Sequence, residues 1–269
     1  DFDEVVCLEQ PYGFFGIGQF YVSFEQLGDD EVIELLAAAR VPRGAAAPDD
    51  PPPAAPAELP VEIEAASGLR LNGDLRLPKG ARGLVIFAHG SGSSRLSPRN
   101  REVAGSLNEA GLATLLFDLL TDEEAADRAK VFDIELLAER LAAVTRWASG
   151  EPRLSDLPLG YFGASTGAAA ALRAAARLGA EIGAVVSRGG RPDLAGGSLP
   201  AVVSPTLLIV GGADWQVLAL NEEAAGLLRC EREVAVVPGA THLFEEPGAL
   251  ERVAELARDW FLRQLPAAG

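Results

Sequence analysis

From about residue 83 onward, short apolar runs alternate regularly with longer helical stretches, and this pattern limits the possible folds to a few. Continuous apolar runs predict strands covered on both faces, as in a parallel sheet with helices on each side. The runs fall at Gly83–Ala88, Ala113–Phe117, Leu159–Phe162, Ile182–Val186, Thr206–Val210 and Glu233–Val237. The helices expected between and after them fall at Arg99–Ala110, Ile134–Ala148, Thr166–Leu178, Gln216–Leu228 and Leu250–Gln264.

Two further strands are expected before this series, at Leu59–Ala65 and Leu69–Leu77. Both segments alternate in polarity and flank the turn pair Ser67-Gly68, which predicts an antiparallel hairpin. The fold class is therefore α/β, with a mostly parallel, doubly wound sheet of about eight strands flanked by helices. Right-handed crossovers place the carboxyl ends of the parallel strands at one edge of the sheet, where ligands bind.

A proline-rich stretch divides the chain into an N-terminal segment (1–41), a linker (42–57) and a main domain (58–269). Seven of the 18 prolines lie within residues 42–60, a density that favours an extended linker over helix or strand. The segment before the linker is rich in aromatic residues and too short to bury them alone. It is expected to pack against the main domain, a second chain or a further domain.

The composition narrows the partners and the compartment. A net charge of −16 argues against binding to nucleic acid or to an anionic membrane surface. No apolar run reaches the length of a membrane-spanning helix, and the first residues lack the basic region of a signal peptide. Two cysteines and two histidines leave little material for a metal centre, so we expect no metal, no cofactor and a cytoplasmic location. The absence of Met predicts that the chain is a piece of a longer protein.

Ser165 is the candidate nucleophile. It stands in Gly163-Ala164-Ser165-Thr166-Gly167, between an expected strand and an alanine-rich expected helix. This is the context of a nucleophile elbow, a turn so sharp that only small residues fit beside the serine. The alternative is a tight turn in which Ser165 merely caps the helix.

A serine hydroxyl needs a base to accept its proton and an acid to orient that base. His242 and Asp214 each follow an expected strand, and their order in the chain after Ser165 is the one found in this class of site. Asp118, which also follows a strand, is the second candidate for the acid, and Asp193 lies in a nearby loop. His242 could alternatively be an ordinary surface histidine.

The oxyanion hole is expected to combine the backbone amide of Thr166 with an amide from the loop that follows the first central strand. Within that loop, Ser91 is favoured and Gly92 is the alternative. His89 is interpreted as orienting the loop; a catalytic role for it is the less favoured reading, because it precedes the nucleophile in the chain.

Residues 58–266 resemble α/β hydrolases of the dienelactone hydrolase-like group. The resemblance rests on Phe87-Ala88-His89-Gly90-Ser91-Gly92-Ser93, the Ser165 motif, Gly212-Ala213-Asp214 and Gly239-Ala240-Thr241-His242. It implies a serine hydrolase that cleaves small carboxylic esters or lactones through an acyl-enzyme, with thioester hydrolysis or acyl transfer as alternatives. Well-known dienelactone hydrolases use a cysteine where this chain has Ser165, so dienelactone itself is doubtful as the substrate.

Only residues 187–205 separate two strands between which many relatives insert a cap domain, so no cap is expected and the pocket should be open. The loop Leu119–Val131 is expected to form one of its walls. Arg188, just beyond a strand, is a candidate contact for an anionic group on the substrate, although an ordinary solvated or paired arginine is the alternative.

Residues 1–40 resemble the C-terminal tail of bacterial phosphoribosyltransferase-like domains. The pattern is Asp3-Glu4-Val5-Val6-Cys7-Leu8, followed by Pro11, Phe15, Tyr21 and Phe24. The resemblance implies a fused or associated phosphoribosyltransferase domain as a partner. The competing hypothesis for the whole chain is an inactive hydrolase-fold module that binds such a domain.

Overall fold

The computed structural model describes residues 57–66 and 68–265. The expected N-terminal segment 1–41 and all of the expected linker except Ala57 lie outside the described residues.

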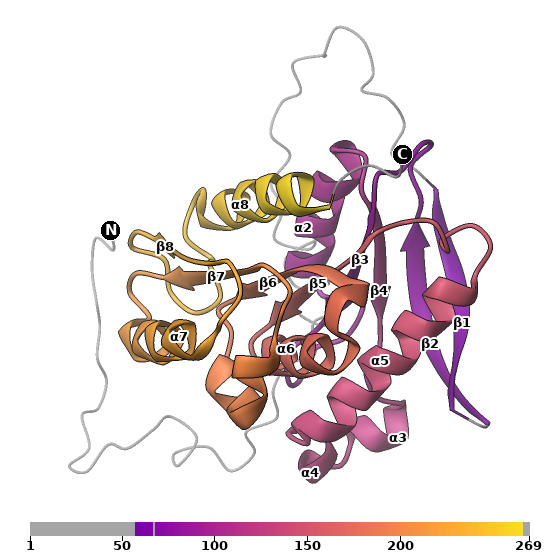
Figure 1. Ribbon diagram of the computed structural model, residues 1–269, viewed down its shortest axis with the longest axis horizontal. Coiled ribbons are helices and arrows are strands. Elements are labelled where there is room, and N and C mark those ends of the chain that lie inside the picture. Colours follow the sequence, from indigo (N-terminus) through magenta and orange to yellow (C-terminus); the bar gives the residue numbers. More distant parts are fainter. Residues whose placement is uncertain (1–56, 67, 266–269) are drawn as a thin grey trace, which may run out of the picture. The chain divides into compact units, whose positions relative to one another are not determined.

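The described residues form one eight-stranded sheet with the strand order β1-β2-β4-β3-β5-β6-β7-β8 (Figure 1). Strand β2 runs antiparallel to its neighbours β1 and β4, and every other neighbouring pair is parallel. The strands are β1 (Glu58–Ala66), β2 (Leu69–Arg76), β3 (Leu84–Ala88), β4 (Ala113–Phe117), β5 (Leu159–Ala164), β6 (Ile182–Arg188), β7 (Thr206–Gly211) and β8 (Arg232–Val237). This is the mostly parallel, doubly wound sheet predicted from the sequence.

Helices cover both faces of this sheet. Helices α2 (Pro98–Glu109) and α8 (Ala249–Gln264) pack together on one face (Figure 1). The other face is covered by α5 (Ile134–Gly150), α6 (Thr166–Leu178) and α7 (Trp215–Leu227). Shorter elements complete the fold: α3 (Asp122–Ala125), α4 (Arg128–Val131) and the 3-10 helices η2 (Gly179–Glu181) and η3 (Pro192–Ala201).

Strand β3 shows why the apolar runs are continuous. Leu84, Ile86 and Ala88 belong to the hydrophobic cluster under α5 and α6, whereas Val85 and Phe87 belong to the cluster under α2 and α8. Successive side chains of a strand point to opposite faces, so a strand covered on both faces needs apolar residues at every position. All five residues of β3 are buried.

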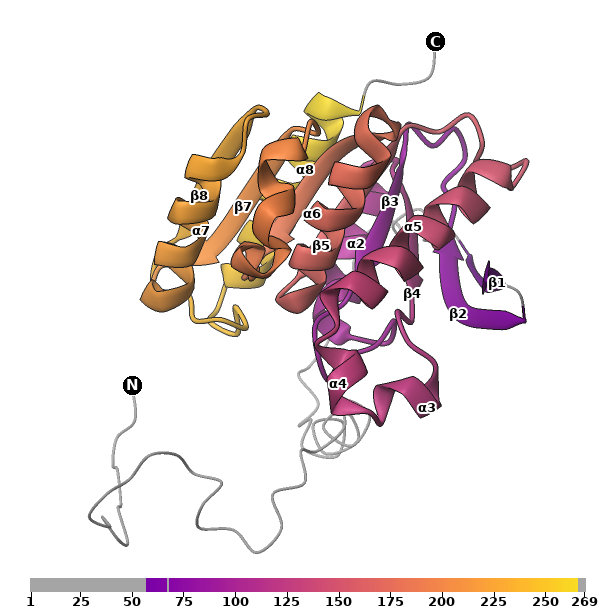
Figure 2. The ribbon, with the colours of Figure 1, turned by 60° about the horizontal axis from the view of Figure 1, so that its bottom comes forward.

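The structure confirms the predicted strands and long helices and adds detail in two loops. The loop Leu119–Val131 contains the two short helices α3 and α4, which lie beside the start of α5 (Figure 2). Thr121 starts α3 with a capping box: its hydroxyl accepts from the Glu124 amide, and the Glu124 carboxylate accepts from the Thr121 amide.

The second loop, between β6 and β7, holds only η3, so the chain has no cap domain there. Among the described helices, none combines the length and apolarity needed to cross a membrane.

Candidate active site

Ser165 lies between β5 and α6 in a strained backbone conformation, with φ 49° and ψ −119°. A positive φ is unfavourable for a residue with a side chain and persists only where the surroundings hold it. Three backbone hydrogen bonds hold this one: the Ser165 amide donates to the Arg188 carbonyl at 3.2 Å, and the Ser165 carbonyl accepts from Arg191 and Ala168, each at 3.1 Å. The geometry is that of a nucleophile elbow.

The two glycines of the motif are required by close backbone contacts. A Cβ at Gly163 would lie 2.5 Å from the Ala168 Cα. A Cβ at Gly167 would lie 2.1 Å from the Ala88 carbonyl oxygen and 2.4 Å from that of His89. Contacts below 3 Å with backbone atoms cannot be relieved by a side-chain rotation, so any larger residue would displace the turn.

Asp214 and His242 meet at the carboxyl ends of β7 and β8. Asp214 Oδ2 lies 2.7 Å from His242 Nδ1. The two loops are joined by a hydrogen bond of 2.9 Å from the Ala213 amide to the Ala240 carbonyl. Gly211 permits this approach, since a Cβ there would lie 2.3 Å from the Ala240 oxygen. Asp214 therefore accepts a hydrogen bond from the Nδ1–H group, which leaves Nε2 as the nitrogen with a free lone pair.

The imidazole of His242 also lies close to the end of β6. A Cβ at Gly189 would be 3.6 Å from its Cε1 atom. Gly189 follows Arg188, which pairs with Ala164 in the sheet. The candidate base, which follows β8, and the candidate nucleophile, which follows β5, thus both lie beside the end of β6 at the carboxyl edge of the sheet.

The two other candidate acids have different partners. Both Asp118 oxygens are bound by Arg95: Oδ1 accepts from its backbone amide at 2.9 Å, and Oδ2 accepts from Nη1 at 2.5 Å. Asp193 forms a two-point ion pair with Arg191, with both N–O distances 2.8 Å. Of the three carboxylates, Asp214 is the one brought to His242.

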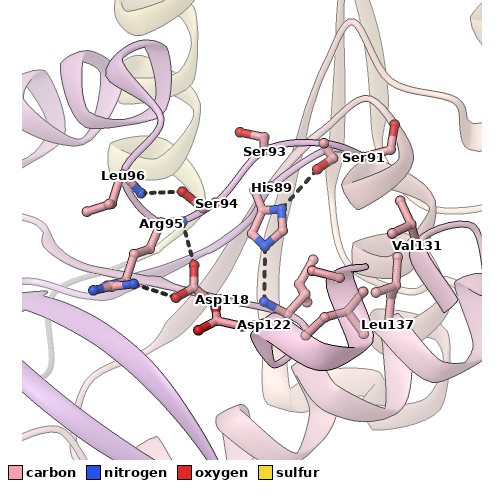
Figure 3. A pocket seen from close by; sticks show the side chains of 15 residues that line it. His89, Ser91, Ser93, Ser94, Arg95, Leu96, Asp118, Asp122, Val131 and Leu137 are labelled. Carbon is pink, nitrogen blue, oxygen red and sulfur yellow. Dashed lines mark hydrogen bonds and ion pairs between the residues drawn. The ribbon is translucent and has the colours of Figure 1, made fainter. Parts of the chain in front are cut away.

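Both ring nitrogens of His89 form hydrogen bonds with backbone atoms. Its Nε2 accepts from the Leu119 amide at 3.0 Å, and its Nδ1 lies 2.9 Å from the Gly90 carbonyl (Figure 3). Because Nε2 accepts, Nδ1 carries the proton and donates it. Burial lowers the pKa of His89 below its ordinary value, which keeps the ring neutral. This arrangement favours the orienting role for His89 over a catalytic one.

The loop His89–Ser94, which we call the candidate oxyanion loop, lies close to the turn at Ser165. A Cβ at Gly90 would lie 3.1 Å from the Ser165 Cβ. The Ser91 amide donates to the side-chain oxygen of Thr166 at 2.9 Å. Gly92 adopts a φ of 69° in the turn that follows. The amide of Ser91, which the sequence analysis favours as an oxyanion donor, is thus paired with the Thr166 hydroxyl in this structure.

A cavity of about 290 Å³ lies beside this loop (Figure 3). Its polar side comes from the oxyanion loop and the Arg95–Asp118 pair, and its apolar side from the segment that contains α3 and α4. The lining residues are His89, Gly90, Ser91, Gly92, Ser93, Ser94, Arg95, Leu96, Asp118, Leu119, Leu120, Asp122, Ala125, Val131 and Leu137. The cavity therefore borders the expected position of the substrate carbonyl.

Known proteins show the same fold and closely related sequences. No family model matches the chain. A crystal structure of dienelactone hydrolase from Anabaena variabilis is 54% identical, with a TM-score of 0.76, over 78% of this chain and 99% of that one. The chain belongs to the dienelactone hydrolase family.

More distant members of the fold are esterases and other hydrolases. The esterase Est1E from Butyrivibrio proteoclasticus is 18% identical with a TM-score of 0.65, a likeness that shows the fold alone. The sequence and the fold together identify a hydrolase.

A longer relative occurs in Mycobacterium tuberculosis, where a protein provisionally named a phosphoribosyl transferase is 56% identical over 99% of this chain. The chain spans 60% of the length of that relative. The relationship bears out the resemblance of the N-terminal residues to a phosphoribosyltransferase.

In the present chain, Arg188 is a buried cation at the end of β6. Its side chain is 8% exposed, and within the described part of the chain its Nε and Nη1 atoms have no hydrogen-bond partner. Burial, together with the nearby positive charge of Arg99, lowers the pKa of Arg188 to about 10. Arg188 is not among the residues that line the cavity described above.

Arg95 has a structural role at the site that the sequence pattern did not predict. Arg95 joins the oxyanion loop to Asp118 and, through an ion pair of 3.4 Å, to Asp74 on β2. Arg101 of α2 also binds Asp74, at 3.0 Å. An aspartate at a strand end, such as Asp118, is a weak signal for such a contact, because it predicts the strand edge and not the partner.

Proposed function

We propose that this hydrolase cleaves small carboxylic esters or lactones through an acyl-enzyme on Ser165. The observation that carries the proposal is the 2.7 Å contact between Asp214 and His242 at the same sheet edge as the strained Ser165. A strained serine at a helix N-terminus, an oriented histidine and adjoining amide donors are the parts that acyl transfer requires.

In this mechanism Ser165 Oγ attacks the substrate carbonyl while His242 Nε2 accepts the hydroxyl proton. The imidazolium is stabilised by Asp214 and returns the proton to the leaving alkoxide. Water then attacks the acyl-enzyme by the same route, with His242 as the base, and releases the acid. For a lactone, the leaving alkoxide and the acid belong to one molecule.

The cavity supports a small substrate. A volume of about 290 Å³ is at the low end for ligand pockets, and η3 replaces a cap that would enclose a longer chain. Leu119, Leu120 and Val131 provide apolar surface for one arm of the ester. His242 is 40% exposed at its side chain, which leaves an open path for water to reach the acyl-enzyme.

Arg188 is the proposed contact for an anionic group on the substrate. Burying a guanidinium is costly unless its donors are paired, and an incoming carboxylate would satisfy the Nε and Nη1 donors that have no partner among residues 57–66 and 68–265. Arg188 lies beside the candidate nucleophile, since its carbonyl accepts from the Ser165 amide at 3.2 Å.

For the longer protein we propose that residues 1–41 are the tail of a phosphoribosyltransferase-like domain, joined by the linker 42–57 to the hydrolase domain 58–269. The name of the longer relative and the share of it that this chain covers support that arrangement. The phosphoribosyltransferase-like domain would then be a fused partner of the hydrolase.

Labelling with a fluorophosphonate tests the proposed nucleophile. The wild-type chain should be labelled and should hydrolyse p-nitrophenyl esters, with a preference for short acyl chains. Ser165→Ala should abolish both signals, whereas Ser155→Ala, at an exposed position away from the site, should retain them. A folded wild-type chain that is neither labelled nor active would instead support the inactive binding module.

A further inference from the structure

The side chain of Thr166 bonds to the amide expected to bind the oxyanion. The Ser91 amide donates to Thr166 Oγ1 across 2.9 Å, between residues 75 positions apart in the chain. A backbone amide has one hydrogen, so this donor is engaged while the contact exists. The close approach of Gly90 to Ser165 and Ala164 limits how far the loop can withdraw.

The Thr166 hydroxyl keeps its own proton available. It accepts from Ser91 and, among the described residues, donates to none. Thr166 is 4% exposed and is the first residue of α6, where backbone amides have no partner within the helix. A hydroxyl that already accepts a hydrogen bond is a stronger donor, and the partial positive charge of the helix terminus favours an anion beside it.

On the basis of the proposed ester or lactone hydrolysis, we infer that Thr166 supplies two oxyanion donors, its backbone N–H and its Oγ1–H. The Ser91 amide then acts as a positioning group that orients the hydroxyl. When Ser165 Oγ bonds to the carbonyl carbon, its proton passes to His242 and the carbonyl π electrons move onto oxygen. Thr166 stabilises that oxygen by hydrogen bonding and transfers no proton.

The opposite role for the hydroxyl makes a different prediction. A hydroxyl that merely filled the oxyanion position would have to leave before the Ser91 amide could act. Its removal would then free the Ser91 amide and raise the rate. The two roles therefore differ in the sign of the effect when the hydroxyl is removed.

The experiment compares wild type, Thr166→Val, Thr166→Ala and Thr166→Ser on p-nitrophenyl butyrate, with thermal unfolding as a check on the fold. Loss of one oxyanion donor reduces kcat by about 100- to 1000-fold, so the Val and Ala variants should fall by that factor with little change in KM. Thr166→Ser should retain most of the wild-type kcat. Binding of phenylboronic acid, which forms a tetrahedral adduct on a reactive serine, should weaken in Thr166→Val as kcat does.

A Val or Ala variant as fast as wild type, or faster, overturns the inference. If Val does not fold, the Ala variant makes the same comparison. If the proposed ester or lactone hydrolysis is wrong, the result is different. The wild type would then be no more active than Ser165→Ala, and the assignment of Thr166 would be wrong as well. An active wild type with an equally active Thr166→Val overturns the oxyanion assignment alone.

Discussion

Asp214 and His242 come from the loops after neighbouring strands, and Asp214 Oδ2 lies 2.7 Å from His242 Nδ1. The contact depends on the backbone as well as on the side chains. The Ala213 amide binds the Ala240 carbonyl, and Gly211 allows the two loops to approach. An acid held in this way fixes which ring nitrogen carries the proton, and so determines which one can act as the base.

Asp214→Asn should reduce kcat for p-nitrophenyl esters by about 10⁴-fold, because the amide NH2 group can donate to Nδ1 and so favours the tautomer whose proton is on Nε2. Steady-state kinetics measure this loss, and thermal unfolding checks the fold. The matched control is Asp193→Asn, which removes a carboxylate bound to Arg191. Comparable losses in the two variants would contradict the assignment of Asp214 as the acid.

Gly167→Ala should lower the free energy of unfolding by about 1–3 kcal/mol or more and reduce kcat, because the new methyl group meets the Ala88 and His89 carbonyls. Urea unfolding measures the change. Gly105→Ala in α2 has no atom within 4 Å of its new Cβ and should stabilise the protein by about 0.5–1 kcal/mol. If both changes stabilised the protein, the steric account of the elbow would be wrong.

His89 should remain neutral below its ordinary pKa of 6.5, because burial disfavours the imidazolium. As the pH falls below 6.5, the unfolded chain takes up a proton at this residue before the folded chain does. The free energy of unfolding should therefore decrease with falling pH in this window, and less steeply in His89→Gln. Urea unfolding at several pH values tests the slope, and ¹⁵N NMR should show the Nδ1-protonated tautomer. Equal slopes in both proteins would contradict the burial argument.

Arg188→Met should raise the free energy of unfolding by roughly 1–4 kcal/mol, because an apolar side chain replaces a buried charge whose Nε and Nη1 atoms have no hydrogen-bond partner among the described residues. It should also reduce hydrolysis of the anionic mono-p-nitrophenyl succinate relative to neutral p-nitrophenyl butyrate. The ratio of kcat/KM values for the two esters measures this effect. Arg70→Met, at an exposed position on β2, should leave the ratio unchanged. An unaltered ratio in Arg188→Met would remove Arg188 from the substrate site.

The strands could be predicted because burial on both faces leaves a direct trace in the sequence. Ala113–Phe117 and Thr166–Leu178 have the predicted limits, and the other strands and long helices differ by one or two residues at their ends. The helices α3 and α4 were not expected, although the pattern from Thr121 to Glu124 is a local capping signal. Short helices depend on such caps more than on hydrophobic periodicity.

For the candidate site, the sequence could predict only those residues whose positions follow from the end of a strand. Asp214 and His242 each follow a strand, so topology alone brings them to one edge. The bond between Ser91 and Thr166 depends on side-chain orientation between distant segments, which no local pattern records. Within the described residues, the unpaired Nε and Nη1 atoms of Arg188 are likewise a property of the packed interior and not of its neighbours in the chain.

The Ser91–Thr166 bond also has a consequence for folding. It connects the loop after β3 to the start of α6, so it can form only when β3 and β5 have paired across the intervening chain. Contacts between residues so far apart close a long loop of chain and form late or slowly. Recovery of hydrolase activity after dilution from denaturant should therefore follow the docking of these segments, and lag behind the recovery of helical circular dichroism.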